Sequence, residues 1–191
     1  MLSHSKEYGI DPQKIVVAGD SAGGHLALTT GFLPASAGLD RECARGDYLG
    51  PDAVPAEMRV AAVVNWYGIS DVNELLDGPN MKTYAVTWLG SQANRDEIAK
   101  RVSPQTYVRA GLPPVLTIHG DADPTVPYSQ SVRLHKMLGS AGVANELMTI
   151  PGGKHGLDCC NLDQRTRVYQ TIQAFLRKHG ILSPQASSTQ P

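Results

Sequence analysis

A serine between glycines is the residue in this chain best placed to do chemistry. Residues 19–24 read Gly-Asp-Ser-Ala-Gly-Gly, so Ser21 lies in a Gly-x-Ser-x-Gly pattern. An apolar run at 14–18 precedes it, and a run rich in small residues and leucine follows at 22–33. A serine on a sharp strand-to-helix turn has its hydroxyl clear of the backbone, and flanking glycines remove steric clashes. The setting predicts a nucleophilic serine at a helix N-terminus, whose free N–H groups can stabilise an oxyanion.

The pattern alone leaves a second interpretation open, because a glycine-rich turn can simply pack tightly or bind a phosphate. The residues that follow in the chain favour chemistry. Asp123 comes just after a third apolar strand, and His155 comes just after a fourth. Serine, acid and histidine in this order, all beyond the carboxyl ends of parallel strands, form the arrangement expected of a catalytic triad. Ser21 would attack an acyl carbonyl, His155 would move the proton, and Asp123 would orient the imidazole.

Each partner also has an interpretation without catalysis. The segment 119–124 reads His-Gly-Asp-Ala-Asp-Pro and offers two acids, Asp121 and Asp123. Acids in turns commonly hydrogen-bond their own backbone, so the spacing alone does not choose between the two. His155 lies in a glycine-rich loop, where a histidine is usually just solvated. The joint placement of the three residues is what favours a shared site.

The elements that must position these residues alternate along the chain. We expect strands at 14–18, 60–67, 114–119 and 145–150, and helices at 22–33, 128–140 and 162–179. The fold class is therefore α/β, a mainly parallel sheet flanked by helices. One domain is expected over 1–182, with 69–112 an insertion over the sheet that holds short helices near 71–77, 81–89 and 94–101. Residues 1–9 are expected to end a helix, 34–58 to form a loop, and 183–191 to be a disordered tail.

Composition excludes several other classes of protein. The chain has 191 residues, a net charge of -1, and no basic stripe typical of nucleic-acid binders. No apolar window is long enough to cross a membrane. The three cysteines are Cys43, Cys159 and Cys160, a poor disulfide framework without metal-ligand spacing. We expect no cofactor, no nucleic acid and no membrane partner; as the chain stands, a cytoplasmic location is favoured.

Aromatic and histidine side chains near the serine are candidates for substrate contact. Asp20, beside the serine, and Trp66 and Tyr67, at the end of the second strand, are the predicted substrate-binding residues. Core packing of Trp66 and Tyr67 is an equally good interpretation, and the same two interpretations apply to Tyr84 and Trp88. His25 is expected to pack beside the serine turn, and His119 to hydrogen-bond its loop.

The motifs resemble those of the α/β-hydrolase family. Gly-Asp-Ser-Ala-Gly-Gly-His-Leu-Ala at 19–27 is similar to the serine turn of esterases and lipases like hormone-sensitive lipase and bacterial feruloyl and acetylxylan esterases. His-Gly-Asp-Ala-Asp-Pro-Thr-Val-Pro at 119–127 resembles a family pattern, His-Gly-x-x-Asp-x-x-Val-Pro, that selects Asp123 as the acid. Pro-Gly-Gly-Lys-His-Gly at 151–156 resembles the histidine loop. The resemblance implies serine-dependent hydrolysis of short-chain or aryl and acetyl esters through an acyl-enzyme, without a metal or organic cofactor.

One departure from the family concerns the oxyanion site. Family members carry a His-Gly-Gly-Gly type segment upstream that donates an N–H, and this sequence has none. The chain resembles the C-terminal two-thirds of a member, which leaves the N–H of Ala22 as the donor. Without the early strands, Ile15, Val16 and Val17 would form an exposed apolar edge, so self-association is expected. The alternatives are a non-catalytic fragment that acts as a binding or assembly module, and a peptidase of the prolyl-oligopeptidase type.

Overall fold

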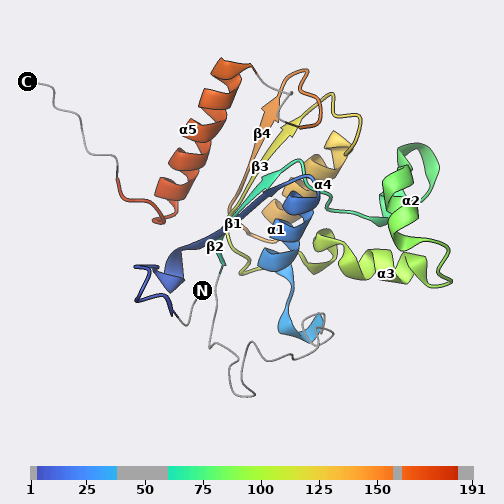
Figure 1. Cartoon of the computed structure of the whole chain (residues 1–191), viewed down its shortest axis with the longest axis horizontal. Coiled ribbons are helices and arrows are strands. Elements are labelled where there is room, and N and C mark those ends of the chain that lie inside the picture. Colours follow the sequence, from blue (N-terminus) through green and yellow to red (C-terminus); the bar gives the residue numbers. More distant parts are fainter. Residues whose placement is uncertain (1–3, 38–59, 157–160, 185–191) are drawn as a thin grey trace, which may run out of the picture.

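A parallel sheet forms the centre of the computed structural model, which describes residues 4–37, 60–156 and 161–184 (Figure 1). Three of its strands are short runs rich in apolar and β-branched residues, as is usual in sheets buried on both faces, and the strand at 145–150 mixes polar and apolar residues. In these residues the sheet has the order β1-β2-β3-β4, and each neighbouring pair is parallel. The strands are β1 (Ile15–Asp20), β2 (Val60–Trp66), β3 (Val115–Gly120) and β4 (Asn145–Ile150). All four therefore present their carboxyl ends at the same edge of the sheet.

Helices cover both faces of this sheet, as the predicted fold class requires. On one face α1 (Ala22–Phe32) and α4 (Tyr128–Ser140) pack on Val63 and Val115. On the other, α5 (Leu162–Lys178) places Val168 and Phe175 on alternate strand residues, namely Ala62, Val64, Leu116 and Ile118. Successive strand side chains point to opposite faces, so each strand contributes to both cores. The α/β prediction is confirmed.

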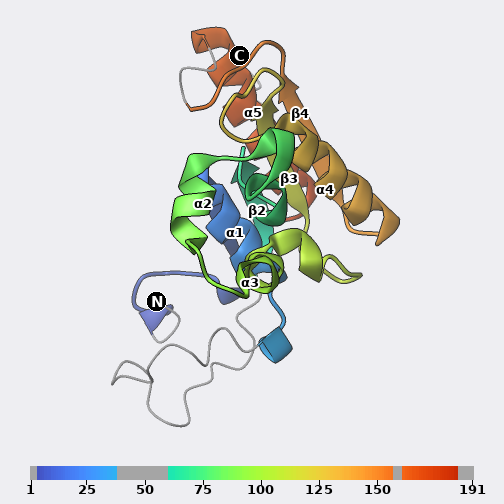
Figure 2. The same ribbon diagram turned by 90° about the vertical axis from the view of Figure 1, so that its right-hand side faces the viewer.

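The segment between β2 and β3 has a small core of its own. It contains the helices α2 (Thr83–Leu89) and α3 (Arg95–Val102) and the single 3-10 turns η5 (Asn73–Leu75), η6 (Gly78–Asn80) and η7 (Pro104–Tyr107). Its buried side chains are Val72, Leu75, Leu76, Ala85, Leu89 and Ala99. Figures 1 and 2 place α2 and α3 beyond α1 as seen from the sheet. The helix expected near 71–77 is only one 3-10 turn.

The beginning of the described chain differs from expectation. Residues 4–9 form turns rather than the end of a helix, and Gly9 has a φ of 65°. Asp11 then caps the 3-10 turn η2 (Pro12–Lys14) by accepting a hydrogen bond from the N–H of Gln13.

Most of the expected loop at 34–58 lies outside the described residues, as do residues 185–191 of the expected tail. Strand β1 lies at the edge of the sheet, with Val16 and Val17 half-buried; self-association through that edge stays a prediction.

The turn from β1 into α1 is the sharpest feature of the backbone. Ser21 has a φ of 52° and a ψ of -116°, a strained conformation for a residue with a side chain. A Cβ at Gly19 would lie 2.3 Å from the carbonyl oxygen of Gly23, so only glycine fits at position 19. A Cβ at Gly24 would lie 2.5 Å from Asn65 Oδ1. Gly23 itself has room, because its Cβ would meet nothing closer than Asp20 Oδ1 at 4.0 Å. The expectation that both glycines flanking the serine avoid clashes is therefore wrong for Gly23.

We predict that Gly19→Ala and Gly23→Ala have different effects on the free energy of unfolding. The Gly19→Ala methyl would push the start of α1 away from β1 and lower the free energy of unfolding by about 1–3 kcal/mol. Gly23→Ala should be neutral or slightly stabilising, because alanine favours a helix. Urea unfolding of both variants tests this, and equal losses would contradict the packing described for the turn.

Candidate active site

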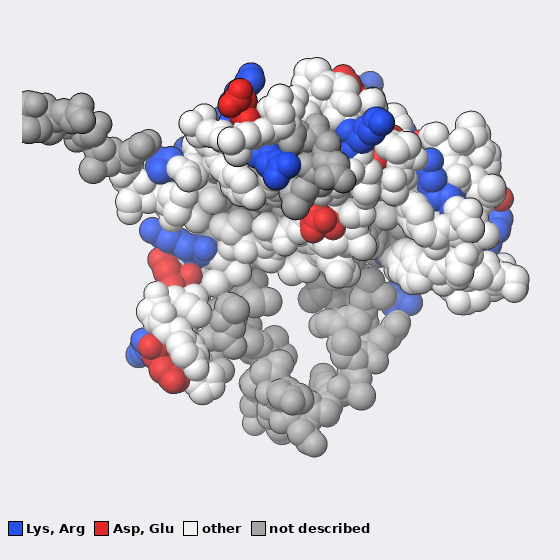
Figure 3. Space-filling model, turned by 45° about the horizontal axis from the view of Figure 1, so that its top comes forward, with Lys and Arg blue, Asp and Glu red and all other residues white. Residues whose placement is uncertain are grey.

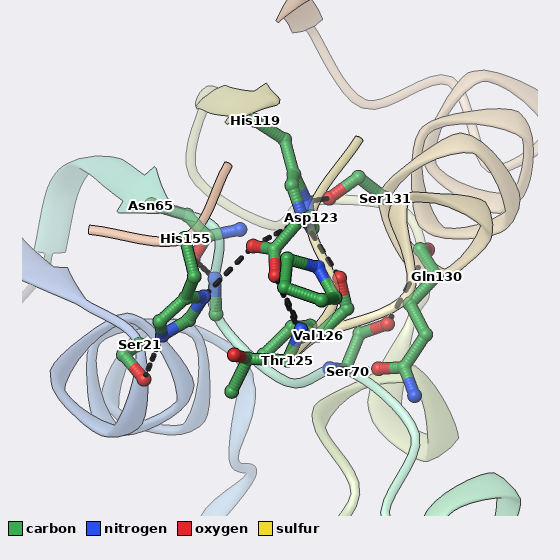
Figure 4. Close-up of polar contacts among 12 residues, drawn as sticks. Ser21, Asn65, Ser70, His119, Asp123, Thr125, Val126, Gln130, Ser131 and His155 are labelled. Carbon is green, nitrogen blue, oxygen red and sulfur yellow. Dashed lines mark hydrogen bonds and ion pairs between the residues drawn. The ribbon is translucent and has the colours of Figure 1, made fainter. Parts of the chain in front are cut away.

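The three residues predicted to act together are hydrogen-bonded in a chain (Figure 4). His155 Nε2 lies 2.9 Å from Ser21 Oγ, and His155 Nδ1 lies 2.8 Å from Asp123 Oδ2. A carboxylate only accepts, so Nδ1 carries the hydrogen and Nε2 is free to accept the hydroxyl proton of Ser21. The geometry is that of a serine activated by a histidine that an acid orients.

The loops that carry these residues meet because two glycines let their backbones touch. Ser21 follows β1, Asp123 follows β3 and His155 follows β4. A Cβ at Gly120 would lie 2.1 Å from the carbonyl oxygen of Gly153. The loop that carries Asp123 and the loop that carries His155 therefore pack backbone against backbone, with no side chain between them. The N–H of Ala122 donates to that same carbonyl at 3.1 Å. This contact sets the separation of the acid from the imidazole.

Asp123 is buried and fully occupied by donors. Its side chain is 0% exposed, and its Oδ1 accepts hydrogen bonds from the N–H of Thr125 at 2.7 Å and of Val126 at 3.0 Å. Burial alone would raise the pKa of Asp123, but hydrogen bonds from His119, His155, Val126 and Thr125 outweigh it and lower the pKa to about 2. The carboxyl group is therefore ionised at neutral pH.

The alternative acid lies elsewhere. Asp121 is exposed, and its Oδ1 accepts a hydrogen bond from the N–H of Gly152 at 2.6 Å. That bond ties the acid loop to the histidine loop without reaching the imidazole. Of the two acids that the sequence offers, only Asp123 contacts His155.

His119 is a neighbour of Asp123 that sequence reasoning missed. The expected hydrogen bond to its own loop is present, since Nε2 lies 3.1 Å from the carbonyl oxygen of Val126. The same Nε2 also lies 3.3 Å from Asp123 Oδ2, and Nδ1 lies 2.7 Å from Ser131 Oγ. The spacing of four residues between the histidine and the acid, across a tight turn, was the signal available in the sequence.

A cavity of about 440 Å³ opens beside Ser21. Its walls are mostly apolar and come from α1, α2 and the chain after β2: Ser21, Ala22, His25, Leu26, Ile69, Val72, Leu75, Tyr84, Ala85, Trp88 and Thr125. Tyr84 and Trp88, for which packing and pocket roles were equally expected, both line it. The Tyr84 hydroxyl donates to the carbonyl oxygen of Thr125 at 3.2 Å. Burial, and then the charge of Asp123, raise the pKa of Tyr84 to about 12, so this hydroxyl keeps its proton.

Two further side chains hold the walls of this cavity. The His25 ring, expected to pack beside the turn, bonds through Nδ1 to the carbonyl oxygen of Ile69 at 3.0 Å and meets Trp88 edge-on. Burial lowers the pKa of His25, and the bond to Ile69 opposes that shift only in part. Gln130 of α4 is fully buried, and its amide oxygen accepts from the N–H of Ser70 at 3.0 Å (Figure 4). The chain that leaves β2 is thus fixed to both α1 and α4.

The three predicted substrate-binding residues line a different hollow. Asp20, Trp66 and Tyr67 border a cavity of about 470 Å³ between the sheet and α5, and Ser21 does not line it. Tyr67 is 2% exposed, and its ring centre lies 4.8 Å from that of His155. Burial, and then the charges of Asp20 and Asp123, raise the pKa of Tyr67 to about 12. Tyr67 packs behind the imidazole, and substrate binding by these three residues stays a prediction.

Metal binding, membrane crossing and charge clustering would each leave a recognisable arrangement of side chains. Within 4–37, 60–156 and 161–184, no group of three or more His, Cys, Asp or Glu side chains could hold a metal ion. Over the same ranges, no helix combines the length and the apolar character needed to cross a membrane. On the face shown in Figure 3, lysines and arginines lie interspersed with acids rather than gathered in one patch.

The parallel sheet, the strained serine turn and the Ser-His-Asp chain define an α/β-hydrolase. Comparison with known proteins agrees, because the model of the BD-FAE family matches residues 1–138. The chain therefore belongs to the BD-FAE family, among the α/β-hydrolase esterases.

Several of the proteins that this chain resembles are esterases longer than the chain itself. Esterase LipQ of Mycobacterium tuberculosis is 30% identical over 177 residues, which cover 89% of this chain and 39% of LipQ. The native structure of esterase 2 of Thermogutta terrifontis is 29% identical with a TM-score of 0.73, covering 97% of this chain and 62% of that one. The same esterase, phosphorylated by paraoxon, gives 28% identity and a TM-score of 0.70 and covers 96% and 60%. This chain thus spans less than two-thirds of the relatives it matches.

We predict that the Asp123 carboxylate stabilises the fold most near neutral pH. Its pKa falls on folding from an ordinary 3.8 to about 2, so its contribution is complete above about pH 4 and is lost as the pH falls through 2. Asp123→Asn should be less stable than wild type at pH 7, and the gap should narrow on acidification. Urea unfolding between pH 3 and pH 7 measures it, with Asp121→Asn on the same loop as the matched control. A gap independent of pH would contradict the assignment.

Proposed function

We propose that this chain carries the catalytic machinery of a serine-dependent carboxylic-ester hydrolase that works through an acyl-enzyme. The observation that carries the proposal is the single imidazole of His155, hydrogen-bonded to Ser21 on one side and to Asp123 on the other. Membership of an esterase-containing family supports the choice of esters over other acyl compounds. Ser21, His155 and Asp123 are the proposed catalytic residues.

The proposed reaction moves one proton back and forth through His155. Ser21 Oγ attacks the ester carbonyl carbon while its proton passes to His155 Nε2, and the carbonyl oxygen becomes an oxyanion. His155 then protonates the alkoxide oxygen of the leaving alcohol, and the acyl group stays on Ser21. A water molecule loses a proton to His155 and attacks the acyl-enzyme, which releases the acid and restores Ser21. Asp123 stabilises the imidazolium formed in both halves.

The N–H of Ala22 is the proposed oxyanion donor. Ala22 is the first residue of α1, where N–H groups have no partner inside the helix. Its place directly after the strained Ser21 and the partial positive charge of a helix N-terminus support this assignment. Loss of one such donor costs about 10²–10³ in rate. An enzyme with the Ala22 donor alone would therefore be slow but measurable.

The apolar cavity beside Ser21 is the proposed binding site for one side of the ester. Its volume of about 440 Å³ and its Tyr84 and Trp88 walls suit a short acyl chain or an aryl group. Acetyl, short-chain and aryl esters are thus the proposed substrates. Asp20, Trp66 and Tyr67 would contribute only if the other side of the ester reached the second hollow.

We predict that Ser21→Ala loses hydrolysis of p-nitrophenyl acetate and butyrate by about 10³-fold or more, because Ser21 is the proposed nucleophile. Steady-state release of p-nitrophenolate at pH 7 is the measurement. Circular dichroism of the variant controls for folding. Equal rates in the two proteins would refute the proposed function.

We also predict that Trp88→Leu and Trp66→Leu differ in their effect on KM. Trp88 lines the cavity at Ser21, so its loss should raise KM for p-nitrophenyl butyrate several-fold with little change in kcat. Trp66 lines the other hollow, so Trp66→Leu should leave KM near the wild-type value. The reverse pattern would place the substrate against α5 instead.

A further inference from the structure

We propose that His119 is a positioning residue: together with Ser131 it fixes the Asp123 carboxylate against His155. The proposal rests on the proposed function, since it concerns the same acid and imidazole. His119 does not reach Ser21 or the cavity, so it would act only through Asp123. The interaction forms a second chain of contacts, Ser131 to His119 to Asp123, on the side of the acid away from the serine (Figure 4).

The neighbours of the His119 ring fix which nitrogen carries its hydrogen. Nε2 faces the carbonyl oxygen of Val126 at 3.1 Å and Asp123 Oδ2 at 3.3 Å, and both of these only accept. Nε2 must therefore be the protonated nitrogen; it donates to the carbonyl oxygen of Val126 and turns its positive N–H edge toward Asp123 Oδ2. Nδ1 lies 2.7 Å from the hydroxyl of Ser131, which can donate to it. The serine thus holds the imidazole in the one neutral form that can donate to Asp123.

The surroundings leave this ring no other arrangement. His119 is 0% exposed, at the end of β3, and Ser131 is 1% exposed, on α4. The rings of Tyr67 and Tyr128 meet the imidazole edge-on. The titratable groups that face this assembly are therefore Asp123, His155, Tyr67 and Tyr128, with Tyr84 near the acid.

The contact should affect the chemistry through the charge on one oxygen. Asp123 Oδ2 accepts a hydrogen bond from His155 Nδ1–H and lies 3.3 Å from His119 Nε2, while Oδ1 accepts from the backbone N–H groups of Thr125 and Val126. If the His119 donor were removed, more of the carboxylate charge would face His155. A protonated His155 would then be favoured, and the acid would be freer to rotate. Removal should therefore displace the acid limb of the kcat/KM profile to higher pH and lower kcat.

The test compares variants that differ in the donor alone. His119→Leu removes the donor, and His119→Gln keeps an amide N–H near the position of Nε2. Ser131→Ala removes the group that fixes the hydrogen on Nε2. The matched control is His135→Leu, because His135 is also a nearly buried histidine, bonded through Nδ1 to Asn145 Oδ1 at 2.8 Å and remote from Asp123. Each protein is assayed on p-nitrophenyl acetate from pH 5 to pH 9.

His119→Leu should lower kcat by about 10- to 100-fold and leave KM little changed. This is the loss usual when a residue that hydrogen-bonds a metal ligand is replaced, and His119 has the same indirect relation to His155. Its acid limb should move to higher pH, Ser131→Ala should shift in the same direction, and His119→Gln should restore most of both properties. If His119 has only a structural role, His119→Leu and His135→Leu should both lower kcat/KM by the same factor at every pH. That result, or an unmoved acid limb, would overturn the proposal.

A second measurement needs no turnover and separates this proposal from the proposed function. The downfield proton resonance of the His155 Nδ1–H bonded to Asp123 should move in His119→Leu but not in His135→Leu. If the wild-type chain hydrolyses no ester but this resonance moves, the proposed function fails and the positioning contact stands. If the resonance stays in place, the positioning role is wrong whatever the activity.

Discussion

The strained turn at Ser21 is the constraint on which the rest of the site depends. A residue with a side chain takes a φ of 52° and a ψ of -116° there, which costs of order 1–3 kcal/mol and persists only when the surroundings enforce it. The enforcing contacts are the bare backbone of Gly19 against Gly23 and of Gly24 against β2. The N–H of Ser21 also donates to the carbonyl oxygen of Trp66 at 2.9 Å, so the turn is fixed to the neighbouring strand. The hydroxyl and the start of α1 consequently face the same space.

The parallel sheet converts this local constraint into a site. Because all strands end at one edge, the acid and histidine loops need only short excursions to meet the serine. A buried carboxylate is costly unless each lone pair finds a donor, and Asp123 meets that condition with two backbone N–H groups and two imidazoles. The fold therefore stabilises the charge that His155 needs, and the stabilising groups come from β3, its following loop and the histidine loop.

Much of this could be predicted from the sequence. The strand predicted at 145–150 has the observed bounds of β4, and apolar runs rich in β-branched residues predicted β1, β2 and β3 within two residues, because buried parallel strands have few alternatives. The order of Ser21, Asp123 and His155 along the chain predicted that they share a site, and the three are hydrogen-bonded in the structure. The choice of Asp123 over Asp121 needed the family resemblance, since both acids suit a turn. These successes share a local cause: each depends on chain order or on the periodicity of a short segment.

Contacts between distant segments could not be predicted in this way. Tyr84 and Trp88 reach the serine because residues 69–102 fold over α1, and no periodicity encodes that placement. Trp66 and Tyr67, adjacent in sequence to a strand end near the site, instead border the hollow beside α5. The role of Gly24 depends on Asn65 of β2 and on Gly68 just after it, and that of His119 depends on Ser131 of α4. Residues 4–9 adopt turns because no packed face holds so short a segment in a helix.

If Ser21 is a nucleophile activated by His155, an organophosphate should react with it covalently. Paraoxon reacts with a serine of this kind by losing p-nitrophenolate and leaving a diethylphosphoryl group on the oxygen. Mass spectrometry of the treated and digested chain should find that group on the peptide holding Ser21, with an equal amount of p-nitrophenolate released. An unmodified Ser21 in the folded protein, or the same labelling in Ser21→Ala, would contradict the account.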